Sequence, residues 1–83
     1  SSQGISLELP IEAVNPENIE AINTIIAKYR GKKRLELQIF DPSKPRVNVK
    51  MPMKGQGVSI NKNALDEFKA LNFARFKLQA SAN

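Results

Sequence analysis

The sequence predicts an α+β fold, a two-layer sandwich in which two helices cover one face of a mostly antiparallel sheet. Two observations lead to this prediction. Four segments alternate apolar and polar residues with the period of two that is typical of a strand with one buried face. Two further segments, between these strands, repeat apolar residues with the spacing of an amphipathic helix. The predicted order is β-α-β-β-(β)-α-β, and right-handed crossovers would place both helices on the same face.

The four main strands are predicted where apolar residues occupy every second position. The second and third of them are separated by a turn with two prolines at residues 41–45, which predicts a hairpin. A short additional strand is predicted at residues 58–60, after a loop that contains two glycines at residues 53–57. The four main strands cover residues 5–9, 35–39, 47–51 and 74–78.

The two helices are predicted from their apolar spacing and from residues suited to their ends. The first helix spans residues 16–30, because Asn15 can cap its amino end and Gly31 suits a left-handed carboxyl-terminal cap. The second helix spans residues 62–71. Its expected caps are Asn61 and Asn72.

The length of 83 residues allows one hydrophobic core, and we expect one domain over residues 5–79. Residues 1–4 are interpreted as a cloning remnant or a linker, and residues 80–83 as a disordered tail. The chain does not start with methionine. We therefore expect an excerpt of a longer protein.

The composition excludes several kinds of chemistry. The chain contains no cysteine and no histidine, so disulfides, thiol nucleophiles, thiolate or imidazole metal sites and histidine bases are excluded. No cofactor and no metal is expected. The apolar runs are far shorter than the ~20 residues of a membrane-spanning helix, and the chain begins with no signal peptide. We expect a cytoplasmic protein.

The charge is positive and unevenly distributed. Thirteen bases and eight acids give a net charge of +5, and residues 1–27 contain four acids and no base. An excess of bases of this kind allows an acidic partner or a nucleic acid. Five bases crowd the predicted end of the first helix and the following turn, and they are either a solvated helix end or a phosphate-contacting patch. This basic patch consists of Lys28, Arg30, Lys32, Lys33 and Arg34.

No catalytic constellation emerges from the acidic residues. Glu8 and Glu36 could be neighbours on the open face of the sheet, and Asp66 and Glu67 are adjacent on a helix. None of them has an accompanying nucleophile, base or metal-ligand spacing, so they are interpreted as solvated surface acids.

The outward face of the sheet is predicted to carry mixed charges. A base-stacking surface would need aromatic residues on the central strands, and a phosphate-clamping GxxG loop is also absent. The residues expected on this face are Glu8, Arg34, Glu36, Gln38, Arg46, Asn48, Lys50, Arg75 and Lys77.

Several segments are informative when they are taken together: Ser6-Leu7-Glu8-Leu9, Asn18-Ile19, Ile22, Ile25-Ile26, Tyr29-Arg30-Gly31-Lys32-Lys33-Arg34-Leu35-Glu36-Leu37, Val47-Asn48-Val49, Val58-Ser59-Ile60 and Leu65-Asp66-Glu67-Phe68. Together these segments resemble the C-terminal domain of the bacterial replicative DNA polymerase III alpha subunit. In that family a strand leads to a helix with a short basic or polar segment and a glycine at its end, then to an aliphatic hairpin and a final helix. The resemblance covers about residues 6–79.

The resemblance implies a noncatalytic part of a DNA-directed DNA polymerase, a nucleotidyltransferase of DNA replication. It implies a protein-interaction module that docks the polymerase onto the tau subunit of the clamp loader. Two alternatives remain. One is a basic module that contacts nucleic acid weakly through the basic patch, and the other is a small ACT-like regulatory domain.

The end of the chain departs from the family pattern because it is more aromatic and more basic. Phe73 would fall on the opposite side of an extended strand from Phe76, beside Arg75 and Lys77. Aromatic and arginine side chains are enriched at interaction hot spots, so these residues are predicted to contact the partner. The alternative is that Phe73 folds over the end of the second helix against Leu71.

Overall fold

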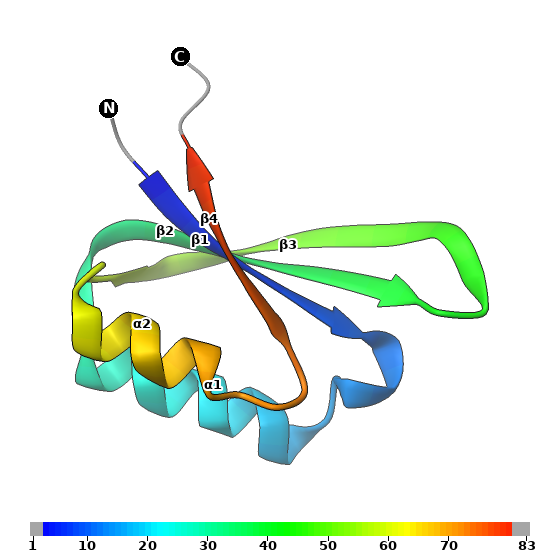
Figure 1. Cartoon of the computed structure of the whole chain (residues 1–83), viewed down its shortest axis with the longest axis horizontal. Coiled ribbons are helices and arrows are strands. Elements are labelled where there is room, and N and C mark those ends of the chain that lie inside the picture. Colours follow the sequence, from blue (N-terminus) through cyan, green and yellow to red (C-terminus); the bar gives the residue numbers. More distant parts are fainter. Residues whose placement is uncertain (1–2, 81–83) are drawn as a thin grey trace.

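The computed structural model describes residues 3–80, which form a four-stranded sheet with two helices on one side (Figure 1). This arrangement confirms the predicted α+β sandwich. The additional strand predicted at residues 58–60 does not form, because β3 ends at Val58 and residues 59–60 belong to no strand. The elements are β1 (Gln3–Pro10), the short 3-10 helix η1 (Ile11–Ala13), α1 (Pro16–Lys28), β2 (Arg30–Asp41), β3 (Lys44–Val58), α2 (Lys62–Lys69) and β4 (Arg75–Ala80).

The strands lie in the order β3-β2-β1-β4, so β3 and β4 are the two edges of the sheet. β1 and β2 are parallel and are connected by α1, whereas β2 with β3 and β1 with β4 are antiparallel. The prediction of a mostly antiparallel sheet is therefore confirmed. The hairpin of β2 and β3 extends well beyond both helices (Figure 1).

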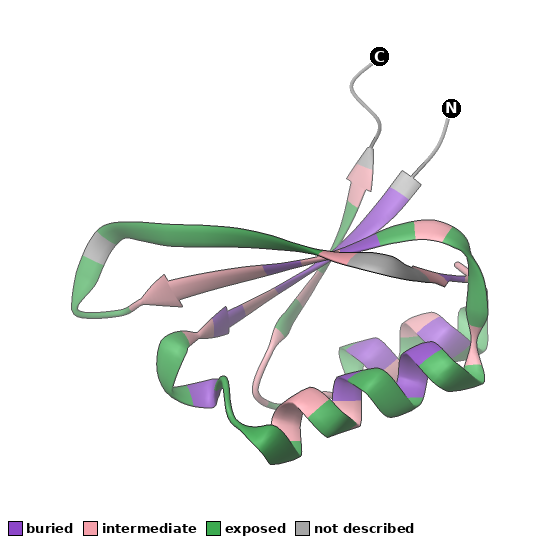
Figure 2. Cartoon of the chain, turned by 180° about the vertical axis from the view of Figure 1, so that it is seen from behind, coloured by how far each residue is buried: buried purple, intermediate pink, exposed green. Residues whose placement is uncertain are grey.

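The core lies between the central strands and the helices, as the apolar spacing predicts. Figure 2 shows the buried positions on the central strands and on the sides of the helices that face them. Ser6, on the other face of β1, is also buried. The fully buried larger side chains are Ile5, Leu7, Leu9, Ile22, Ile26, Leu35, Val58 and Phe68.

Both predicted amino-terminal caps are present, but the carboxyl ends of the helices differ from the predictions. The side-chain oxygens of Asn15 and Asn61 each accept a hydrogen bond from the backbone N–H three residues later, at 2.9 Å. α1 ends at Lys28 with Tyr29 as its cap. Gly31 is therefore not a helix cap and lies in β2. α2 ends at Lys69 with Ala70 as its cap, so the expectation for Asn72 was wrong.

β3 is longer than predicted, because residues 53–57 continue the strand instead of forming a loop. Two glycines permit this. A Cβ atom at Gly57 would collide with the carbonyl oxygen of Gly31, and one at Gly31 would lie 2.6 Å from the backbone nitrogen of Ser59. The start of β2 and the end of β3 thus approach more closely than side chains would allow.

The termini of the described chain extend the sheet. Gln3 and Gly4 belong to β1 and Ala80 ends β4. The remainder of the predicted linker and tail, residues 1–2 and 81–83, lies outside the described residues.

Candidate interaction surfaces

The face of the sheet that the helices do not cover is the outward face of the sequence prediction, and we call it the open face. It carries the polar and charged side chains that the alternation of apolar and polar residues predicts. Glu8 lies opposite both Gln38 and Arg75, and Gln38 lies opposite Lys50, so these side chains share one face. Phe40 and Gln79 also belong to this face but were not predicted there; Phe40 lies opposite Pro10, and Gln79 lies opposite Gly4. The position of Phe40 two residues after Gln38 was the signal that could have revealed it.

Both acids of the open face contact side chains of β4. Lys77 Nζ lies 3.1 Å from Glu8 Oε2, and Gln79 Nε2 donates to Glu36 Oε1 at 2.8 Å. The Glu8 side chain is only 21% exposed, so it is less solvated than predicted. These contacts leave the cations of β2 and β3 on this face without an ion pair to the other described residues.

The structure separates the five cations of the basic patch. Lys28 belongs to the last turn of α1, where its Nζ forms an ion pair with α2. The other four lie in β2 and not in a turn. Lys33 is half-buried on the side of the helices, whereas Arg34 points to the open face. The basic patch is therefore not one surface.

Glu67 joins the two helices through a pair of hydrogen bonds. Its Oε2 accepts from Lys28 Nζ at 2.8 Å and from the Tyr29 hydroxyl at 2.6 Å. These bonds lower the pKa of Glu67, and the bond to Glu67 is the main reason that the pKa values of Lys28 and Tyr29 are raised. The acid predicted to be merely solvated is thus a structural link.

We expect the stability that Glu67 contributes to disappear in acid. A carboxyl with a lowered pKa in the folded state stabilises the fold above its ordinary value of 4.5, and the effect is lost as the pH falls through the folded-state pKa. Glu67→Gln should therefore melt at a lower temperature than the wild type. This difference should be largest at about pH 7 and should shrink as the pH falls below 4.5. A difference that stays constant down to about pH 3 would contradict this assignment.

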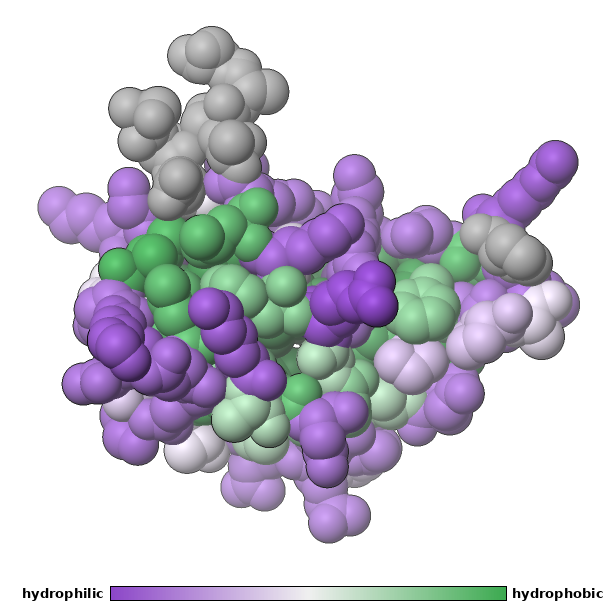
Figure 3. Space-filling view, in the orientation of Figure 1, coloured by the Kyte–Doolittle hydropathy of each residue, from purple (hydrophilic) through white to green (hydrophobic). Residues whose placement is uncertain are grey.

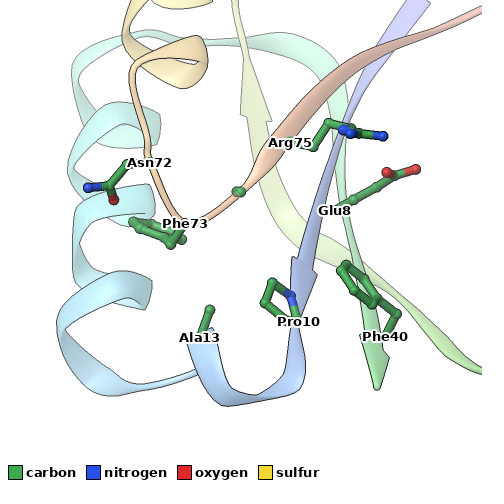
Figure 4. Close-up of a pocket in the computed structure, with 8 residues that line it drawn as sticks. Glu8, Pro10, Ala13, Phe40, Asn72, Phe73 and Arg75 are labelled. Carbon is green, nitrogen blue, oxygen red and sulfur yellow. The ribbon is translucent and has the colours of Figure 1, made fainter. Parts of the chain in front are cut away.

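Phe73 lines an open groove where the chain turns from α2 into β4 (Figure 4). The groove has a volume of about 550 Å³. Phe73 is half-buried and packs against the core, and it precedes β4 instead of belonging to an extended strand. Arg75 also lines the groove but Lys77 does not. The other lining residues are Glu8, Pro10, Ala13, Phe40, Asn72 and Ala74.

A row of apolar side chains on β3 is exposed, although it lies on the same face of the sheet as the core. Val47, Val49 and Met51 are 45%, 52% and 49% exposed. Val49 lies opposite Ile39 and Met51 opposite Leu37, so all three point to the helix side of the sheet. The hairpin projects beyond the helices, and β3 is exposed along most of its length (Figures 1 and 2). We call these three side chains the apolar row.

The opposite edge of the sheet also exposes apolar surface. Leu78 of β4 is 47% exposed. Figure 3 shows hydrophobic side chains gathered between the start of α2 and the outer part of β4, with hydrophilic side chains around them. Leu78 provides a matched comparison for the apolar row, because it is a similarly exposed aliphatic residue on the other edge strand.

The structure is a small α+β domain whose projecting hairpin exposes apolar side chains on one face. The family model described as DNA polymerase III alpha subunit, C-terminal domain, matches residues 5–79, so the chain belongs to this family and is a module of a replicative DNA polymerase. The resemblance inferred from the sequence is confirmed. No curated protein matches the chain. Neither helix in the described residues is long and apolar enough to cross a membrane.

Proposed function

We propose that this domain is a noncatalytic docking module that attaches the polymerase to the tau subunit of the clamp loader. The observation that carries the proposal is the apolar row on the underside of the hairpin. Exposed apolar side chains that adjoin one another mark protein-interaction sites more often than isolated ones do.

The apolar row could supply a substantial part of a binding free energy. Full burial of a valine or methionine side chain contributes about 1.5–3 kcal/mol, and roughly half of each side chain remains exposed in the free domain. Covering all three would then contribute roughly 2–4 kcal/mol, which corresponds to an affinity change of about 30- to 1000-fold. Because this contribution is apolar, it should survive moderate salt.

The proposal is tested by a double substitution in the apolar row. We expect Val49→Ser with Met51→Ser to weaken binding of purified tau by about tenfold or more, measured by calorimetry at about 150 mM salt. Leu78→Ser is the control, and we expect it to leave the affinity unchanged. Melting temperatures of both variants report whether the fold is intact. Equal affinity losses in the two variants, or none in either, would contradict docking through the apolar row.

The groove beside Phe73 is the second surface to test, because Phe73, Arg75 and Lys77 remain the partner contacts predicted from the sequence. Arg75 is exposed, so Arg75→Ser probes the groove without disturbing the core. Phe73→Ser should lower the melting temperature, because Phe73 packs against the core. Unchanged tau affinity in both variants would assign Phe73 a structural role only.

A further inference from the structure

The β2–β3 hairpin carries all of the net positive charge of the domain. Between Arg30 and Val58 the sequence contains eight bases and two acids, a net charge of +6. The rest of the chain contains five bases and six acids, a net charge of −1. Half of these bases, Arg30, Lys32, Lys33 and Arg34, lie at the start of β2 next to α1, whereas Lys44, Arg46 and Lys50 follow the projecting turn on β3 (Figure 1). We call the β2–β3 hairpin the arm.

Arg34, Arg46 and Lys50 lie on the open face of the arm, whereas Lys33 lies on the helix side. Lys50 lies opposite Gln38, and strand alternation places Arg46 on the same side of β3. Arg34 occupies this face of β2. Both acids of the open face contact β4 instead, so they do not neutralise Arg46 or Lys50. The face thus presents exposed cations interspersed with amide side chains, all on a two-stranded ribbon.

We propose that the open face of the β2–β3 hairpin binds the phosphate backbone of duplex DNA. The major groove admits a two-stranded β-ribbon, and cations that neutralise phosphates supply affinity without reading sequence. Phe40 is the single aromatic residue of the described open face, so stacking of single-stranded bases is not favoured. The chain belongs to a DNA polymerase family, and DNA is the substrate of such an enzyme. Because the apolar row lies on the other side of the ribbon, both partners can be bound together.

The test compares two variants of equal net charge. Arg46→Gln with Lys50→Gln removes two cations from the arm, and Lys62→Gln with Lys69→Gln removes two exposed cations from α2. Binding to a fluorescent duplex of arbitrary sequence is measured by anisotropy between about 50 and 200 mM salt, alongside a single strand of the same length. The arm variant should weaken duplex binding on the order of tenfold and reduce the slope of log affinity against log salt by about 1.8. The α2 variant should change neither value appreciably.

Four results would overturn the proposal. The first is no duplex binding by the wild type at about 50 mM salt. The second is an equal loss in both variants, which would show that only net charge matters. The third is loss of tau binding by the arm variant with DNA binding unchanged, which would make the open face a protein contact. Tighter binding of the single strand than of the duplex would also reject the ribbon geometry. Melting temperatures confirm that both variants are folded.

Discussion

Phe68→Ala is expected to destabilise the domain by about 3–5 kcal/mol, as truncation of a buried phenylalanine usually does. Phe68 is fully buried on the inner side of α2 and stacks on Phe76 of β4, with ring centroids 6.5 Å apart. Its removal would leave a cavity between α2 and the sheet. A domain of this size has a free energy of unfolding of roughly 4–12 kcal/mol, so the variant should lose much of its stability.

Urea denaturation provides the measurement, and Leu65→Ala provides the control. Leu65 lies on the same helix but is only half-buried, so its truncation should cost clearly less. If the two variants had equal midpoints, the contact between Phe68 and Phe76 would not be what holds α2 on the sheet.

The sequence predicted the elements whose signals are local. Alternation along β1 and β2 identified which side chains face the helices, because each residue of a strand points to the side opposite its neighbour. Asn15 and Asn61 identified the starts of the helices, because their side chains bond backbone groups three residues away. These predictions depend on a few neighbouring residues and not on distant packing.

The predictions failed where distant parts of the chain decide the structure. Gly31 has the sequence context of a helix cap. A glycine is required there for another reason, because the end of β3 and the following Ser59 approach the backbone of Gly31 too closely for a Cβ atom. Tyr29 and Glu67 are 38 residues apart in the sequence, so their hydrogen bond has no local signature.

The candidate site shows the same limit. Alternation correctly assigned Val47, Val49 and Met51 to the inner face of the sheet. It could not predict that they would be exposed, because that depends on how far the helices extend beneath the hairpin. The five cations of the basic patch lie within residues 28–34, but strand alternation places Lys33 and Arg34 on opposite faces.

Gly57→Ala is expected to have the second largest effect on stability. It should lower the free energy of unfolding by about 1–3 kcal/mol or somewhat more. The new Cβ atom would overlap the backbone of Gly31, and backbone cannot rotate away as a side chain can. β2 and β3 would have to separate at the end of the hairpin that joins the two helices, where β2 begins after α1 and β3 ends before α2. Val58 follows Gly57 directly and is fully buried, so its side chain would shift with the strands.

Gly4→Ala is the matched control, because a Cβ atom there would lie 3.0 Å from the carbonyl oxygen of Arg34. That contact is tight but needs only a small adjustment, so the loss of stability should be smaller. Thermal melting of both variants ranks them, and amide exchange reports whether the protection lost at Gly57→Ala is concentrated in β2 and β3. Equal melting temperatures for Gly57→Ala and the wild type would show that the two strands can separate freely. The close approach of Gly31 and Gly57 would then not be what fixes the direction of the hairpin.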